Sequence, residues 1–366
     1  MHTHARTLRS ISLLALTAVG VLEGCGEDGE AASVETSDTT GTSEDGGTSG
    51  PATTDTASST SASTGDGEDG STTTVTGDGD GDGDGDGDAT TGGYSTTGGD
   101  GDGDGDPLGA CDTSPPPGMT LVWCDDFDGL DIDAGKWEFE VNAWGGGNNE
   151  LQYYTDRPEN ARIEDGLLVI EAREETYTGP EGTRDYTSAR LRTVNKGDWT
   201  HGRFEMRGRL PIGQGIWPAF WMLPTDWVYG GWAASGEIDI VELLGQEPNR
   251  VYGTLHYGGE WPQNTSSSGD TEWGTHDFIL ASGTFNDGFH EFAIEWDPEE
   301  IRWYVDGTHY QTQVNWFSTA GAYPAPFDQD FHFVANVAVG GNWPGSPDPS
   351  TQFPQQFQLD WVRVYQ

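Results

Sequence analysis

Basic residues are scarce in this 366-residue chain, which has 16 Lys and Arg against 62 Asp and Glu, and a net charge of −46. Residues 26–110 hold 21 of the acidic residues and no basic ones, so about −25 of the net charge belongs to the rest of the chain. A surface this acidic repels nucleic acid and other anionic polymers. We therefore expect no nucleic-acid partner and a neutral substrate or ligand.

Long hydrophobic runs are also missing. The apolar run Ile11–Leu22 is too short to span a bilayer, but it follows two arginines as the core of a signal peptide does. Leu22-Glu23-Gly24-Cys25 then resembles a bacterial lipobox, although Glu23 departs from the usual small residue. We expect residues 1–25 to be a signal peptide and Cys25 to be lipidated, which would anchor an exported protein to the cell envelope or surface. Ordinary signal cleavage with free secretion is the alternative.

Apolar residues are rare in residues 26–110, which consist mainly of Gly, Asp, Ser and Thr. A segment of this composition cannot offset the entropy of ordering its backbone, so we expect a disordered, self-repelling tether. The Gly-Asp alternation in residues 77–88 and 99–106 also invites a calcium-binding interpretation. It lacks the apolar position that lets repeat β-helices stack, and a solvated spacer is the simpler interpretation.

Cysteine is limited to Cys25, Cys111 and Cys124. If Cys25 carries lipid, Cys111 and Cys124 are the remaining pair, and export makes a disulfide between them plausible.

Sustained helical periodicity is absent from residues 111–366, where apolar and polar residues alternate in short runs. The dipeptide Asp306-Gly307 separates two such runs and predicts a two-residue hairpin. Many strands without alternating helices predict one all-β domain, a two-sheet β-jelly-roll sandwich. The expected strands include Leu167–Ala172, Gly202–Leu210, Glu291–Trp296, Ile301–Val305 and Phe357–Tyr365.

Three acids stand in one strand-forming segment, at Glu237, Asp239 and Glu242. In a regular strand Glu237 and Asp239 share a face, whereas Glu242 points to the other one. A β-bulge near Ile240-Val241 would return Glu242 to their face. Carboxylates crowded on one face repel each other and serve no structural purpose unless something binds there. An edge strand with a solvated acidic face is the alternative.

Aromatic residues near these acids favour a carbohydrate ligand. Retaining glycosidases use two carboxyl groups about 5–5.5 Å apart, and two Glu on one bulged strand suit that spacing. Trp217 and Trp221 are four residues apart and so share a strand face, where apolar sugar faces can stack on them. We expect Trp217, Trp221 and Trp232 to bind substrate, while filling of the core is the alternative for any one Trp.

The segment Gly236–Glu242 resembles the Glu-x-Asp-x-x-Glu motif of glycoside hydrolase family 16, in the form found in laminarinases. Further segments resemble the same proteins in matching order, over about 240 residues: Leu121–Phe127, Asn148–Tyr154, Trp217–Leu223, Gly340–Gly345 and Asp360–Tyr365. The resemblance implies a jelly roll with an open cleft on its concave face and retaining endo-hydrolysis of β-1,3 bonds in glucans.

The motif also implies roles for single residues. Glu237 corresponds to the nucleophile and Glu242 to the acid/base, while Asp239 is expected to hydrogen-bond Glu237. His256 matches a position near the acid/base, with a satisfied buried histidine as the alternative. Asn148 and Arg190 fall in segments that supply polar contacts to the substrate.

The resemblance further implies a structural calcium ion held by Asp126, a backbone carbonyl near Gly166, and Asp360, with Asp126 standing where the family usually has Glu. We expect a monomer that needs no cofactor for catalysis. A different polysaccharide, such as a mixed-linkage β-glucan or a galactan, and a non-catalytic glucan-binding surface protein remain as alternatives.

Overall fold

The computed structural model describes residues 109–267 and 277–366. The predicted signal peptide, Cys25 and the linker up to residue 108 lie outside the described residues. Within the described part of the chain, no helix is long and apolar enough to cross a membrane. The only helical elements there are two short 3-10 turns, η1 (Ala110–Asp112) and η2 (Gly145–Gly147).

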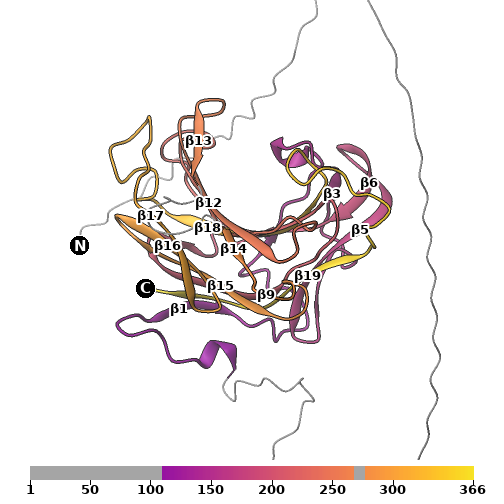
Figure 1. Ribbon diagram of the computed structural model, residues 1–366, viewed down its shortest axis with the longest axis horizontal. Coiled ribbons are helices and arrows are strands. Elements are labelled where there is room, and N and C mark those ends of the chain that lie inside the picture. The colour runs from indigo at the N-terminus through magenta and orange to yellow at the C-terminus, as the bar shows by residue number, and fades with distance from the viewer. Residues whose placement is uncertain (1–108, 268–276) are drawn as a thin grey trace, which may run out of the picture. The chain divides into compact units, whose positions relative to one another are not determined.

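One β-sheet contains ten of the described strands, in the order β17-β16-β15-β9-β19-β5-β6-β3, with β1 beside β19 and β4 beside β5 (Figure 1). All pairs in it are antiparallel except β3 with β6. Its strands are β1 (Leu121–Asp125), β3 (Gln152–Tyr154), β4 (Ala161–Glu164), β5 (Leu167–Gly179), β6 (Gly182–Ser188), β9 (Gly202–Arg209), β15 (His290–Asp297), β16 (Glu300–Val305), β17 (Thr308–Gln313) and β19 (Gln355–Tyr365).

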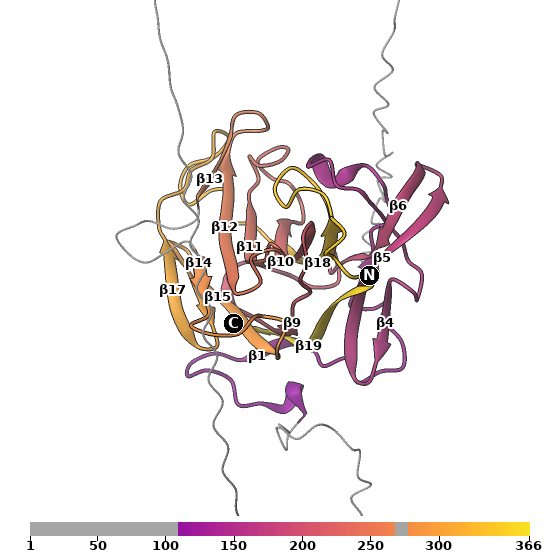
Figure 2. The ribbon, with the colours of Figure 1, turned by 45° about the vertical axis from the view of Figure 1, so that its right-hand side comes forward.

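The second sheet contains nine described strands, in the order β13-β12-β11-β10-β18-β7-β2, with β14 beside β12 and β8 beside β18. Figure 2 shows its central strands β12, β11, β10 and β18 side by side. Its strands are β2 (Glu138–Phe139), β7 (Arg190–Arg192), β8 (Asp198–Trp199), β10 (Ile216–Pro224), β11 (Glu237–Glu242), β12 (Arg250–Gly258), β13 (Asn264–Ser267), β14 (Asp277–Ile279) and β18 (Phe331–Val339).

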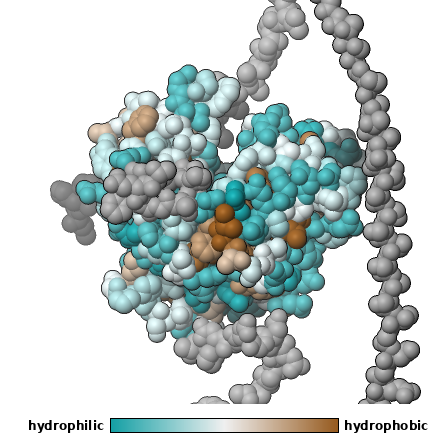
Figure 3. Space-filling view, viewed as in Figure 1, coloured by the Kyte–Doolittle hydropathy of each residue, from teal (hydrophilic) through white to brown (hydrophobic). Residues whose placement is uncertain are grey.

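The hydrophobic core lies between the two sheets and is rich in aromatic rings. Phe204 of the first sheet and Phe220 of the second are both fully buried, and each packs against Phe333. On the face shown in Figure 3 the described surface is mainly hydrophilic, with hydrophobic residues in small patches. Since side chains alternate along a strand, the neighbours of Phe220, such as Trp221, point to the outer face of the nine-stranded sheet.

The predicted all-β sandwich is confirmed, and each of the five expected strands is present within a residue or two of its predicted ends or as part of a longer strand. Asp306-Gly307 forms the turn between β16 and β17, and both residues have positive φ as a two-residue hairpin turn requires. The disulfide between Cys111 and Cys124 is formed, and it ties η1 to β1.

Candidate active site

A β-bulge in β11 sets the direction of the three acids. On β12, Asp239 pairs with Thr254 and Glu242 with Tyr252, so three steps on β11 match two on its partner. On β10, the register skips Ile240, which is the extra residue and is buried. The predicted bulge near Ile240-Val241 is therefore present, and it returns Glu242 to the face of Glu237 and Asp239.

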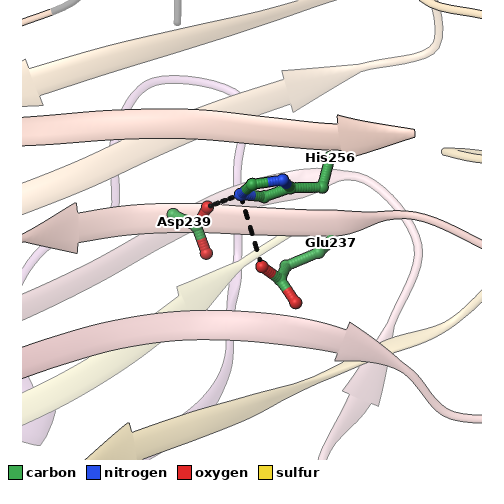
Figure 4. Close-up of side chains that lie close together, drawn as sticks. All are labelled: Glu237, Asp239 and His256. Carbon is green, nitrogen blue, oxygen red and sulfur yellow. Dashed lines mark ion pairs between the residues drawn. The ribbon is translucent and has the colours of Figure 1, made fainter. Parts of the chain in front are cut away.

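Glu237 and Asp239 share one histidine partner (Figure 4). The Nε2 atom of His256 lies 3.5 Å from Oε1 of Glu237 and 3.3 Å from Oδ2 of Asp239. His256 stands opposite Glu237 in the β11–β12 register, so the pairing of the strands brings these groups together. The expected direct hydrogen bond between Asp239 and Glu237 does not appear among the described contacts, because His256 stands between the two carboxylates.

Each glutamate accepts a hydrogen bond from a different tryptophan. The Trp232 indole Nε1–H donates to Oε2 of Glu237 at 2.8 Å, and the Trp217 indole Nε1–H donates to Oε1 of Glu242 at 3.0 Å. Two of the three tryptophans predicted to bind substrate thus also hold the candidate catalytic carboxylates. The sequence placed these rings near the acids but gave no sign of the indole hydrogen bonds.

Further aromatic residues lie around Glu242, which is 8% exposed. The Trp217 ring packs edge-on against Trp343 at 5.3 Å between ring centroids, and Trp343 packs against Tyr252 at 5.2 Å. Neither Trp343 nor Tyr252 was singled out from the sequence. Trp343 lies in the segment Gly340–Gly345, which resembles the family, and Tyr252 lies four residues before His256. These positions were the signals from which both residues could have been predicted.

Burial and mutual repulsion set the protonation of this cluster. Burial, together with the charge of Asp239, raises the pKa of Glu237 to about 7 and raises the pKa of Glu242 well above its ordinary value. Burial lowers the pKa of His256, but the charges of Glu237, Asp239 and Glu242 outweigh it and raise that pKa to about 10. At neutral pH the site therefore holds an imidazolium and a partly ionised Glu237, and the raised pKa of Glu242 favours its protonated form.

The same cluster is the only one in residues 109–267 and 277–366 in which three His, Cys or carboxylate ligand atoms lie close enough to share an ion. The imidazolium of His256 already balances the two carboxylates beside it, so no cation is required to offset their repulsion.

Trp221 of β10 and Arg190 of β7 are in contact, with β18 between their strands. The Arg190 guanidinium stacks on the Trp221 ring at 4.7 Å and pairs with Glu140 at 3.3 Å. The Trp221 indole Nε1–H donates to Oδ1 of Asn336 on β18 at 2.8 Å. Trp221 was expected to stack on sugars and Arg190 to supply polar contacts, and the structure brings the two side chains into contact. Asn336 was not foreseen.

Asn148 is connected to Trp221 through buried polar groups. Its Nδ2 donates to Oε1 of Glu150 at 3.3 Å, and the Tyr154 hydroxyl donates to Oε2 of the same carboxylate at 3.4 Å. Nδ2 of Asn336 donates to the Tyr154 hydroxyl at 3.1 Å, which completes a chain of hydrogen bonds from Asn148 to Trp221. Glu150 and its partners lie within the segment Asn148–Tyr154, whereas the Asn336 partner of Tyr154 comes from a distant part of the sequence.

The strand register relates the three predicted calcium ligands to one part of β19, in the other sheet. β1 pairs with the end of β19, Asp125 opposite Val362, and β5 pairs with its start, Leu168 opposite Leu359. Asp126 and Gly166 therefore flank Asp360 at the junction between the two pairings. The Asp360 carboxylate forms an ion pair with Arg207. Oxygen ligands from separate segments suit calcium, but the ion would have to compete with this guanidinium.

The chain is similar in sequence and fold to known glucan-cleaving enzymes. A β-glucanase of Rhodothermus marinus is 46% identical over 267 residues, which cover 70% of this chain and 89% of that protein. The glucan endo-1,3-β-glucosidase A1 of Niallia circulans is 41% identical over 68% of this chain, which spans only 38% of that longer protein. The X-ray structure of the laminarinase from Rhodothermus marinus aligns with a TM-score of 0.59 and 45% identity, covering 68% of this chain and 97% of that structure.

The model of the family "Glycosyl hydrolases family 16" matches residues 148–363, which include β11 and every residue of the acid cluster. That span is more than half of the chain. With two carboxylates on one bulged strand and relatives above 40% identity, the chain belongs to glycosyl hydrolases family 16 and is a glycoside hydrolase.

Proposed function

We propose that this enzyme hydrolyses internal β-1,3 bonds in glucans of the laminarin type, with retention of configuration. The observation that carries the proposal is the bulge at Ile240, which puts Glu237 and Glu242 on one face of β11. A two-step, retaining glycosidase needs two carboxyl groups that face the same ligand. The substrate is taken from the relatives, which are named as β-glucanase, glucan endo-1,3-β-glucosidase and laminarinase.

Glu237 acts as the nucleophile in this proposal. A nucleophile must be ionised, and Glu237 has two partners that favour its anion, the Trp232 indole donor and the imidazolium of His256. Its attack on the anomeric carbon forms a covalent glycosyl-enzyme as the leaving sugar departs. Asp239 fixes His256 from the other side, and through it biases the charge on Glu237.

Glu242 acts as the acid and then as the base. Its pKa is raised well above its ordinary value by burial and by Asp239, so it holds the proton that the departing oxygen needs. After the sugar leaves, the Glu242 carboxylate takes a proton from water, which attacks the glycosyl-enzyme. The Trp217 donor keeps Glu242 in one orientation through both steps.

The remaining predicted residues would bind the neutral sugar chain. Trp217, Trp221 and Trp232 offer rings on which apolar sugar faces stack, and Arg190 and Asn148 supply polar contacts. A neutral polymer also agrees with the acidic surface, because sulfated polysaccharides would call for basic subsites. We further propose export with Cys25 as lipid anchor, a monomeric enzyme, and calcium at Asp126, Gly166 and Asp360 as a structural ion.

Azide rescue of two alanine variants tests the mechanism. Either variant should lose at least about a hundredfold in laminarin cleavage, the lower scale of acid–base contributions. With an activated aryl β-glucoside long enough to fill the site, Glu242→Ala should still form the intermediate, and azide should release a β-glycosyl azide. Glu237→Ala should give the α-azide, because azide then attacks from the empty nucleophile side.

The configuration of the azide product decides between the two assignments. Reversed products would exchange the roles of Glu237 and Glu242, and near-normal cleavage of laminarin by both variants would refute the site. Wild-type digestion of laminarin, lichenan and agarose, with product analysis, tests the substrate in parallel. Agarose or lichenan as the preferred polymer would refute the proposed specificity while leaving the hydrolase chemistry intact.

A further inference from the structure

Three loops form one hydrogen-bonded unit at the end of the site where β11 begins and β12 ends. They connect β10 to β11, β12 to β13, and β17 to β18. The backbone N–H of Trp261 donates to the carbonyl of Trp232 at 2.8 Å, and the N–H of Gly258 donates to the carbonyl of Phe317 at 3.0 Å. The Ser318 hydroxyl donates to the carbonyl of Ala234 at 3.0 Å. The loops therefore hold one another in place.

Two aromatic side chains of this unit face solvent. Trp261 is 72% exposed and Phe317 is 52% exposed, although most tryptophans of the described domain are at least half-buried. The Phe317 ring packs edge-on against Tyr257 at 5.5 Å, and a Cβ atom at Gly258 would lie 3.5 Å from it, so the ring rests on the end of β12. The two exposed rings belong to loops joined by the Gly258–Phe317 hydrogen bond, and large apolar side chains exposed on one part of a surface often mark binding sites.

The Trp261 loop is also fixed on its other side. The carboxylate of Glu260 accepts a hydrogen bond from the backbone N–H of Gly231 at 2.7 Å, one residue before Trp232. The loop is thus connected at Glu260 and at Trp261 to the segment that carries Trp232. Because the backbone that carries the Trp261 ring is already fixed, less conformational freedom is lost when a ligand stacks on the ring, which favours binding.

The exposed rings continue the proposed substrate site. Trp232 donates to the nucleophile Glu237 and its backbone carbonyl accepts from Trp261. Its ring also packs at a tilt against His256, with 5.5 Å between ring centroids. A polymer bound at Glu237 extends beyond the sugars that touch the carboxylates. Trp261 is joined to Trp232 by a backbone hydrogen bond, and the carbonyl of Phe317 accepts from Gly258, three residues before Trp261. The exposed apolar surfaces of both rings match the apolar faces of pyranose sugars.

We propose that Trp261 and Phe317 form an accessory platform that binds the β-glucan chain beyond the catalytic centre, on the Trp232 side. Its role is to hold polymer, so it raises affinity for long chains without taking part in bond cleavage. The identity of the ligand rests on the proposed function, whereas the platform itself rests on the exposure and connection of the two rings.

Binding to an insoluble β-1,3-glucan tests the platform without hydrolysis. The parent is Glu237→Gln in the full chain, and to it are added Trp261→Ala, Phe317→Ala or Trp261→Phe. We expect each alanine substitution to weaken binding to curdlan about five- to tenfold, and Trp261→Phe to keep most of the affinity because a ring remains.

Tyr323→Ala is the matched control. Tyr323 is exposed to a similar extent, 49%, and belongs to the same β17–β18 loop, but its hydroxyl donates to the carbonyl of Glu299 and its ring stacks on Trp316. Tyr323 therefore contacts the turn between β15 and β16 rather than the segment that carries Trp232. Its loss should leave curdlan binding unchanged. Equal weakening by Tyr323→Ala and Trp261→Ala would overturn the platform.

Kinetics separate this proposal from the function on which it rests. With Glu237 intact, Trp261→Ala should raise KM for laminarin several-fold while kcat/KM for a short activated aryl glucoside stays unchanged. Normal laminarin cleavage by the wild type together with unweakened curdlan binding by Trp261→Ala would refute the platform alone. Failure of the wild type to cleave laminarin would refute the proposed function, and with it the proposed ligand.

Discussion

Replacing Trp232 with phenylalanine should move the pH dependence of the enzyme in a defined direction. The substitution keeps an aromatic ring and removes the indole N–H that donates to Glu237 at 2.8 Å. A hydrogen bond to a charged group contributes about 1.5–3 kcal/mol, and one pKa unit corresponds to about 1.36 kcal/mol. The pKa of Glu237, already raised to about 7, should therefore rise by about one to two units.

The sign follows from the protonation state that the indole favours. The N–H stabilises the ionised form of Glu237, so its loss favours the protonated form, and the nucleophile becomes available only at higher pH. The acid limb of kcat/KM should shift upward by about one to two pH units. At pH 7 the ionised fraction of Glu237, and with it the rate, should fall about 5- to 50-fold.

Trp217→Phe is the matched control, because its indole donates to Glu242 instead. Loss of that donor also raises a pKa, but here it is the pKa of the group that must be protonated, so the alkaline limb should move upward and the acid limb should stay. Initial rates on a soluble laminarin oligosaccharide over the full pH range measure both limbs. Loss of ring stacking alone lowers the rate equally at every pH. An unmoved acid limb in Trp232→Phe, or exchanged behaviour of the two variants, would refute the assignment of Glu237 and Glu242.

Four further outcomes are expected. Asn336→Leu leaves the part-buried indole N–H of Trp221 without its acceptor, so it should lower the free energy of unfolding by about 1 kcal/mol and raise KM for laminarin; an unchanged melting curve and KM would contradict the hydrogen-bond chain. A chain beginning near Pro107 should fold and match full-length activity on soluble substrate, and a large loss of specific activity would show that the linker packs on the domain. Cys25→Ser should release active enzyme into the soluble exported fraction, and a wild type that is already soluble there would rule out the lipid anchor. Calcium should raise the melting temperature of wild type but not of Asp126→Ala, while activity stays unchanged; an equal shift in both would remove the proposed ion site.

The sequence by itself determined the features that depend on residues close together along the chain. Alternation of apolar and polar residues in runs such as Gly202–Leu210 predicts strands, because side chains alternate between the two faces of a strand. The spacing of Glu237, Asp239 and Glu242 predicts a bulge, because only an extra residue brings all three to one face. The segments that resemble glycoside hydrolase family 16 in matching order then predicted the fold and the class of enzyme. All of these follow from residues within a few positions of one another, or from a motif carried over whole.

Tertiary structure decided which distant side chains meet. His256 stands between Glu237 and Asp239 because β12 pairs with β11 in one register, and no local pattern predicts a register between strands. The chain from Asn148 through Glu150, Tyr154 and Asn336 to Trp221 joins groups from three strands and a loop, and its members look like ordinary polar residues in the sequence. The ion pair of Arg207 with Asp360 depends on packing in the same way. Hydrogen bonds and ion pairs act only over a few ångströms, so they are fixed by the positions of whole strands, whereas strand formation and the bulge depend on geometry within one strand.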